Sequence, residues 1–268
     1  MDLAGGALRS FRDGSFDPEQ PGRRTATVDV ISSTRPGALI MAAIQFTDRR
    51  TATRLSVESL ALARAASAAT SAPSIGSGQP WRWRIDGPVL SLYAALYPDR
   101  TGAVDVDDAR LIVNCGIALH HARTALAADG VAADVRYLPD PADPGLLARI
   151  SHAGRARAGA GEVRLYRAIA ARRSDSRPPV AGPVPDATID RLLAAARRPG
   201  IDLRVRAGLI GVAPTDDHPE VLLGTGEATS AILLTANVEG LATELTPGAP
   251  GAATTVRFGV PAPGVWIR

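Results

Sequence analysis

The chain has 268 residues, 46% of them hydrophobic, and its 30 basic residues exceed its 27 acidic residues by a formal charge of only +3. This composition allows a substantial core in one large domain or two small ones. All basic side chains are arginine because the sequence contains no lysine, which excludes a pyridoxal Schiff base, a lysine-dependent aldolase and a Walker A phosphate loop.

The single cysteine, Cys115, permits neither an internal disulfide nor a cysteine-rich zinc site. It lies in an apolar helical stretch, which favours a buried structural thiol over a reactive one. The longest apolar run, residues 37–44, is too short to cross a bilayer, and no charged segment and cleavage site frame it. We therefore expect a cytoplasmic protein that does not bind membranes.

Residues 1–48 mix Gly, Pro, Ser, Asp and Arg without a sustained hydrophobic period. We predict a flexible N-terminal extension there, with Met41 as an alternative functional start, and a single domain over residues 49–268.

Hydrophobic periodicity predicts the elements of this domain in chain order. The first half is expected to contain a helix at 55–70, a β-hairpin at 81–93 around Asp86-Gly87, a long helix from about Asp105 to Gly130 and a strand at 132–138. The second half is expected to contain helices at 162–171 and 186–198, a strand at 201–206, a long helix at 219–245 and a strand at 254–260.

The two long helices share a pattern. Stretches that begin Gly116-x-Ala and Gly226-x-Ala end at Gly130 and Gly240, with the same interval between glycines and an acidic residue before the second one. Small residues at such positions let helices approach closely, as a central buried helix pair requires. A chance match in so alanine-rich a chain stays open as the alternative.

Two segments are candidates for chemistry. In residues 72–81 (Ala-Pro-Ser-Ile-Gly-Ser-Gly-Gln-Pro-Trp), prolines restrict the backbone and glycines permit turns that expose amides to a planar ligand. In residues 172–177 (Arg-Arg-Ser-Asp-Ser-Arg), three guanidinium groups and two hydroxyls suit a phosphate. The alternatives are a helix-to-strand connector with a buried tryptophan and a solvated charge run at a helix C-terminus.

Together these segments resemble the Acg group of nitroreductase-like proteins. The resemblance rests on residues 72–81 and 172–177 and on Cys-Gly-x-Ala-Leu at 115–119, with further ordered matches at 226–228 and 239–241, and it covers roughly residues 50–245. It implies an α+β fold with a central antiparallel or mixed sheet and two long buried helices. It also implies two pseudo-repeated halves fused in one chain, at about 49–155 and 156–268, in a monomer or homodimer.

The resemblance further implies an FMN site. Arg172, Arg173 and Ser174 would hold the phosphate, ribityl chain or ring edge, with Arg177 nearby. Residues of the first segment (Pro73, Ser74, Ser77 and Gln79) would lie at the isoalloxazine ring, and Thr225 and Gly226 would lie close to the flavin.

In the implied reaction NAD(P)H reduces FMN, and a small acceptor such as a nitroaromatic or quinone then reoxidises it; no protein side chain has to act as a strong acid or base. Three departures from the family pattern favour an alternative, a non-catalytic or degenerate flavin-binding or storage protein. Ser77 replaces the usual asparagine, the region between residues 245 and 254 is too short for the family's covering segment, and the chain ends at Arg268 before an arginine-containing tail.

Other classes fit less well. His120 and His121 point about 100° apart on a helix, which disfavours a shared metal ion. Gly224-Thr-Gly226 lacks the rest of a dinucleotide loop. Arginines are interleaved with acids and aromatic residues make up 4% of the chain, so we expect no nucleic-acid binding.

Overall fold

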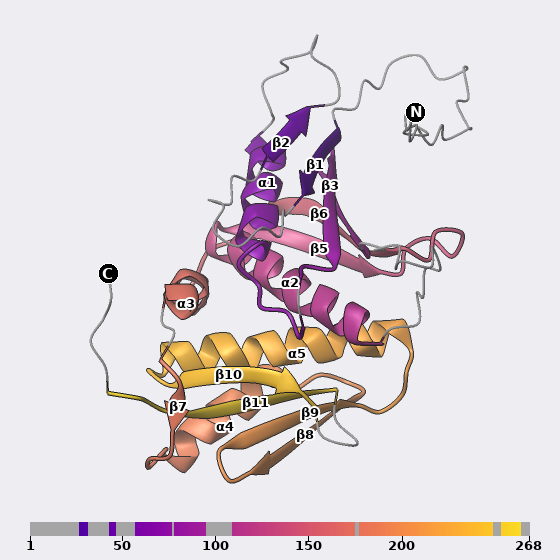
Figure 1. Cartoon of the computed structure of the whole chain (residues 1–268). Coiled ribbons are helices and arrows are strands. Elements are labelled where there is room, and N and C mark those ends of the chain that lie inside the picture. Colours follow the sequence, from indigo (N-terminus) through magenta and orange to yellow (C-terminus); the bar gives the residue numbers. More distant parts are fainter. Residues whose placement is uncertain are drawn as a thin grey trace, which may run out of the picture.

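The computed structural model describes residues 27–31, 43–46, 57–76, 78–94, 109–174, 177–248 and 253–263. These residues form an α+β fold in which two antiparallel sheets lie on either side of a central pair of long helices (Figure 1).

The first sheet has the strand order β2-β1-β3-β4-β6-β5, with every neighbour antiparallel. Its strands are β1 (Thr27–Ile31), β2 (Ala43–Phe46), β3 (Trp81–Asp86), β4 (Val89–Ala94), β5 (Val131–Tyr137) and β6 (Leu146–Arg155). Strands β3 and β4 confirm the predicted hairpin. Trp81, Trp83 and Ile85 are buried while the arginines between them are exposed, as an alternating half-buried strand requires.

The second sheet has the order β10-β11-β9-β8, and β7 pairs with the other end of β11. Its strands are β7 (Pro179–Val180), β8 (Ile201–Arg206), β9 (Leu209–Pro214), β10 (Ala242–Pro247) and β11 (Thr254–Pro261). The order β8-β9-β11-β10 matches β3-β4-β6-β5 in the first sheet. Within these two sets of four strands a long helix follows the second strand along the chain: α2 separates β4 from β5, and α5 separates β9 from β10.

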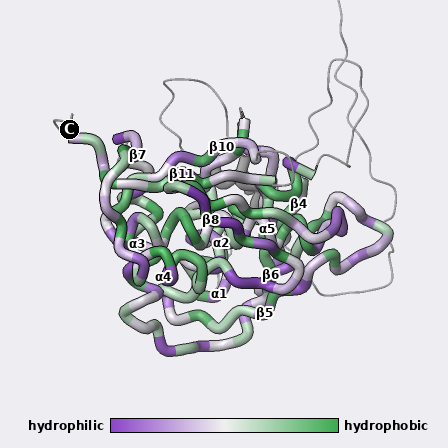
Figure 2. The backbone as a smooth tube through the Cα atoms, turned by 90° about the horizontal axis from the view of Figure 1, so that it is seen from below, coloured by the Kyte–Doolittle hydropathy of each residue, from purple (hydrophilic) through white to green (hydrophobic). Residues whose placement is uncertain are grey.

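Five described helices fill the space between the sheets: α1 (Val57–Ala69), α2 (Ala109–Ala128), α3 (Ala160–Ser174), α4 (Asp186–Ala196) and α5 (Pro219–Val238). Helices α1 and α2 pack on the first sheet around Leu62, Trp83 and Leu119. Helices α4 and α5 pack on the second sheet around Leu192 and Ile232. In Figure 2 the hydrophobic positions accordingly run through the inner helices and strands.

Helix α5 is the one described helix that is long and apolar enough to cross a membrane. In this fold it is instead a core helix, packed along α2 on one side and against the second sheet on the other. A helix that is apolar all round is expected in either setting.

The close approach of α2 and α5 depends on two glycines. A Cβ atom added at Gly116 would overlap the carbonyl oxygen of Leu223 and lie 3.0 Å from the Cα of Gly226. A Cβ added at Gly226 would overlap the carbonyl oxygen of Val113 and lie 2.8 Å from the Cα of Gly116. The contact is therefore reciprocal: each glycine lies against the other glycine and against the carbonyl group three residues before that other glycine. This close approach confirms the predicted central helix pair.

Several of the predicted element bounds were wrong. The helix predicted for residues 219–245 ends at Val238, because Gly240 adopts a φ of +76° and closes a Schellman motif in which the amide of Leu241 donates to the carbonyl of Ala236. Residues 242–247 then pair with β11 as a strand. Strands β6 and β9 were not predicted, and α3 extends to Ser174, three residues beyond its expected end.

The predicted N-terminal extension contains two strands, since β1 pairs with both β2 and β3. Residues 101–108, where the first long helix was expected to begin, lie outside the described residues; α2 is described from Ala109.

Candidate functional site

The loop between α1 and β3 is fixed by side chains at both of its ends and in its middle. Asn114 of α2 accepts a hydrogen bond from the amide of Ile75 (2.8 Å) and donates one to the carbonyl of the same residue (3.3 Å). Gln79 donates through Nε2 to the carbonyl of Thr70 at 2.7 Å. Ser74 donates through Oγ to the carbonyl of Gly78 at 2.5 Å. The described residues of this loop, 72–76 and 78–80, are thus held in place against α2.

Two glycines in this loop need their conformational freedom. Gly76 and Gly78 adopt φ values of +98° and +107°, which side-chain-bearing residues rarely adopt. The predicted tight turns are therefore present. Ser77, which lies between them, is outside the described residues.

Arg172 brings the second predicted segment to this loop. It lies in the last turn of α3 and donates through Nη2 to the carbonyl of Ser71 at 2.9 Å. Ser71 directly precedes the loop, so segments a hundred residues apart in the sequence meet at this point. The guanidinium also faces His121, whose pKa it helps to lower.

The rest of the arginine segment is described only in part. Arg173 and Ser174 complete the last turn of α3, but their side chains lie outside the described residues, and Arg177 is half-buried where the chain is described again. The first residues of the predicted polar loop, Arg172 to Ser174, therefore form the last turn of α3. Helix C-termini carry partial negative charge, which attracts arginine and opposes a phosphate.

Thr225 and Gly226 lie within α5, in its contact with α2. The Thr225 hydroxyl donates to the carbonyl of Val221 at 2.9 Å, and the residue is fully buried. Gly226 faces Gly116 across the helix contact. The contacts of both residues in the described chain are those of helix packing, and their assignment to the cofactor stays a prediction.

The two adjacent histidines meet at one hydroxyl. Nδ1 of His120 lies 2.8 Å from Oγ of Ser230, and Nδ1 of His121 lies 3.0 Å from the same atom and 3.0 Å from the carbonyl oxygen of Ile117. Burial, with the nearby Arg172 second, lowers the pKa of His121 to about 3, and burial also lowers the pKa of His120. Both rings are therefore neutral at pH 7.

A buried carboxylate forms a second polar centre between α2 and α5. Glu227 is 2% exposed; its Oε1 lies 2.5 Å from Nη1 of Arg123, and its Oε2 accepts from the hydroxyl of Tyr137 at 2.9 Å. Nε of Arg198 lies 3.7 Å from Oε2. Burial raises the pKa of Tyr137 to about 12, and the neighbouring carboxylate contributes to the rise. The phenol therefore remains a donor.

Asn114 and Glu227 were not predicted from the sequence as functional residues. Each is a polar residue within an otherwise apolar helical run, and a buried polar group has to find partners in the fold. That interruption of the hydrophobic pattern is the signal that identifies both.

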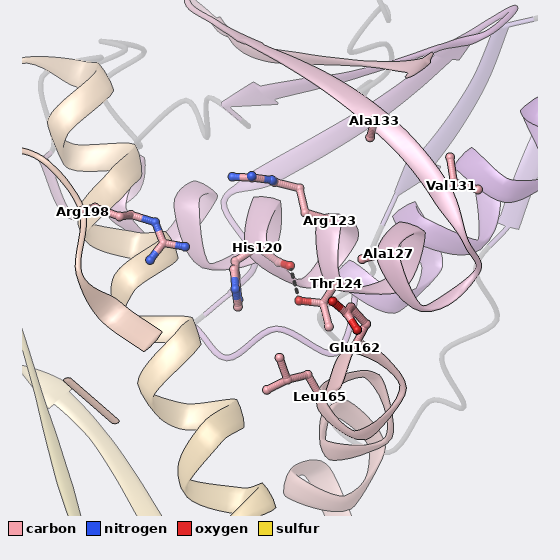
Figure 3. A pocket seen from close by; sticks show the side chains of 9 residues that line it. All are labelled: His120, Arg123, Thr124, Ala127, Val131, Ala133, Glu162, Leu165 and Arg198. Carbon is pink, nitrogen blue, oxygen red and sulfur yellow. Dashed lines mark hydrogen bonds between the residues drawn. The ribbon is translucent and has the colours of Figure 1, made fainter. Parts of the chain in front are cut away.

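Two cavities flank the Glu227 centre, and Arg123 and Arg198 line both. The first, of about 300 Å³, also contains His120, Thr124, Glu162 and Leu165 (Figure 3). The second, of about 540 Å³, lies at the N-terminal end of α5 and the C-terminal end of α4. A third cavity, of about 740 Å³, is lined by residues of α2, of β6, of the start of α5 and of the segment 138–144 between β5 and β6.

Cys115 is completely buried, and its Sγ lies 3.4 Å from the carbonyl oxygen of Pro80. Burial raises the pKa of the thiol, so it is a poor nucleophile. In the described part of the chain, no three His, Cys, Asp or Glu side chains are grouped so that they could hold a metal ion.

The connection between β10 and β11 is a short hairpin. Pro247 pairs with Thr254, and the amide of Gly248 donates to the carbonyl of Ala253 at 3.2 Å. Residues 248–253 separate the two strands.

Comparison with curated proteins identifies relatives in Mycobacterium tuberculosis. A protein named "Putative NAD(P)H nitroreductase" is 42% identical over 137 residues, which is 51% of this chain and 39% of the relative. A second protein of that name, acg, is 40% identical over 80 residues, 30% of this chain and 24% of the relative. An uncharacterized protein is 31% identical over 110 residues, 40% of this chain and 32% of its own length.

The matches cover less than half of each relative's length. No family model matches the chain.

Proposed function

With the resemblance to Acg-like nitroreductases confirmed by these relatives, we propose that the chain is an FMN-binding, NAD(P)H-dependent oxidoreductase that reduces nitroaromatic or quinone-like acceptors. One structural observation supports this most directly. Arg172 hydrogen-bonds to the residue before the Pro-Ser loop, so the two segments that the resemblance assigns to FMN lie together.

The arginines of residues 172–177 carry the charge that a flavin phosphate requires. Guanidinium groups carry full positive charges, which outweigh the partial negative charge of the helix end from which they project. Asn114 holds the loop in one conformation, which lowers the ordering cost of binding a planar ring. Arg172, Arg173 and Ser174 would hold the phosphate end, and Pro73 and Ser74 would contact the ring.

Bound FMN supplies hydride acceptance from NAD(P)H and electron donation to the oxidised acceptor. The chain's own contribution is binding and orientation. Its buried histidines are neutral at pH 7 and its cysteine is protonated, so none of them provides an ionised acid or nucleophile. This agrees with a reaction that needs no strong protein acid or base.

The experiment is to purify the protein, record its visible spectrum and add NADPH anaerobically. Bleaching of a flavin band, followed by reoxidation with a nitroaromatic, supports the proposal; protein that stays colourless after incubation with FMN contradicts it. Arg172→Ala should weaken FMN affinity about tenfold or more, because a charge-assisted hydrogen bond contributes about 1.5–3 kcal/mol. Arg164→Ala, an exposed arginine on the same helix, is the matched control.

A second candidate is a flavin-binding protein without turnover, for storage or as a degenerate relative. The serine at position 77 and the short connection between β10 and β11 motivate it. In this case the purified protein is yellow but does not bleach with NADPH.

We also propose that the two halves are structural repeats that resemble a fused dimer. Matching strand orders and the reciprocal Gly116–Gly226 contact support this. His120 and Ser230, each four residues after its glycine, touch one another across the same contact of α2 and α5. We expect a monomer or homodimer in the cytoplasm, where NAD(P)H is available, which light scattering and cell fractionation would test.

A further inference from the structure

The cavity at the start of α5 is lined by more positive charge than its carboxylates neutralise. Arg123, Arg197 and Arg198 all line it, and Glu220 and Glu227 are its carboxylates. Both oxygens of Glu227 are already engaged, by Arg123 and by Tyr137, with Arg198 close to the second. Glu220 is exposed to solvent, where its charge is screened.

Two of these arginines, Arg123 and Arg198, lie close to the same carboxylate, that of Glu227. The side chain of Arg198 is 22% exposed and that of Arg123 is 40% exposed. Figure 3 shows them extending toward one another from α2 and from the end of α4, above the ring of His120. Partial burial lowers the pKa of Arg198, and its repulsion from Arg123 adds to that effect, while Glu227 opposes it. One carboxylate for two partly desolvated guanidiniums leaves a local positive excess.

The backbone adds to this field. Helix α5 begins at Pro219, and residues of its first turn line the cavity. Helix N-termini carry partial positive charge and favour anions. Pro219 has no amide hydrogen and the amide of Glu220 donates to Nδ1 of His218, so these two residues offer the helix dipole but no free donor. The cavity is therefore lined by the partly buried Arg123 and Arg198, by the exposed Arg197 and by the first turn of α5. Its neighbour around His120 lacks Arg197 and the helix start and contains Glu162 instead.

We propose that this cavity binds the phosphate group of a small phosphorylated molecule. Arginine forks bind carboxylates and phosphates through paired hydrogen bonds, and of the two a phosphate group carries the larger negative charge at pH 7. The volume of about 540 Å³ exceeds the need of a free phosphate ion, and the apolar side chains of Pro199 and Val221 provide contacts for an attached organic group. This site is separate from the proposed flavin segments and does not depend on them.

The test is a thermal-shift and calorimetric titration of the purified protein with inorganic phosphate, against sodium chloride at equal ionic strength. We expect a saturable rise in Tm and saturable heat with phosphate only. Arg197→Gln should weaken phosphate binding about tenfold, as the loss of one charge-assisted contact. Arg197 is exposed and is not part of the Glu227 centre, so its replacement should leave the fold intact.

Two control variants locate the effect. Arg206→Gln, an exposed arginine of β8, should bind phosphate like the unchanged protein. Arg172→Ala should also retain phosphate binding at this cavity, because Arg172 does not line it. Three outcomes overturn the proposal: no phosphate effect beyond chloride, an effect that Arg197→Gln leaves unchanged, or an effect that only Arg172→Ala removes.

Discussion

Replacing Gly226 with alanine tests the contact on which the whole arrangement of the two sheets depends. The added methyl group would meet the carbonyl oxygen of Val113 and would lie 2.8 Å from the Cα of Gly116. Both are backbone atoms of a buried helix, so neither can rotate away. The two helices would have to separate along their contact, and the packing on both sheets would follow.

The magnitude is the difference between two effects. Overpacking a rigid core usually costs about 1–3 kcal/mol, and a backbone-to-backbone contact belongs at the upper end of this range. Alanine is better than glycine inside a helix by about 1 kcal/mol. We therefore expect a net loss of about 2 kcal/mol, which lowers Tm by roughly 4–8 °C. Gly116→Ala should cost a similar amount, since the contact is reciprocal.

Urea denaturation followed by circular dichroism measures these changes. Gly161→Ala in α3 is the matched control, because a Cβ at that position meets nothing within 4 Å and the variant should be unchanged or slightly stabilised. The double variant at 116 and 226 should lose less than the sum of the single losses, because one separation of the helices relieves both overlaps. Gly226→Ala with the stability of the unchanged protein would refute this account of the helix pair.

Three further changes have defined outcomes. Glu227→Gln should lower the free energy of unfolding in urea by about 3 kcal/mol, because two partly buried arginines lose their counter-charge. Its control, Glu244→Gln, breaks an exposed ion pair and should cost under about 1 kcal/mol. Equal losses for the two variants would contradict the buried network. Asn114→Ala should lower the free energy of unfolding by about 1–3 kcal/mol, because the amide of Ile75 loses its partner. Limited proteolysis of this variant should then cut within residues 72–80. A loop that stays uncut would show that other contacts are enough to hold it. The pKa of His121 in the folded protein is about 3, below that of the unfolded chain. The unfolded state therefore binds the extra proton below about pH 6.5, and stability falls toward pH 4 by up to about 1.4 kcal/mol per pH unit for this residue. His121→Gln should make the decline shallower, and an unchanged slope would assign it to other groups.

Local patterns were enough to predict many elements. The Trp81 to Tyr93 hairpin was recognisable because its residues alternate and a turn dipeptide separates its strands, both of which are properties of neighbouring residues. The central helix pair was recognisable from the repeated glycines. The ordered motifs at 72–81 and 172–177 also led to the nitroreductase resemblance, which the relatives confirm.

Strand β6 shows where local patterns fail. Leu146 to Ala148 are all buried, so these consecutive residues do not alternate in the way a half-buried strand does. The end of α5 is similar: Leu241 continues the helical composition, but the turn at Gly240 and the pairing with β11 make the next residues a strand. Tertiary pairing decided both.

The sequence by itself determined which segments are helical, which glycines matter and which family the motifs resemble, because these depend on residue type and spacing. Only the tertiary structure decided that Arg172 reaches the end of the Pro-Ser loop, that His120 and His121 share the hydroxyl of Ser230, and that Glu227 gathers Arg123 and Arg198. The partners in each case are many residues apart in the chain. Buried polar groups must be satisfied, but which distant residue satisfies them is fixed by how the two layers of helices pack.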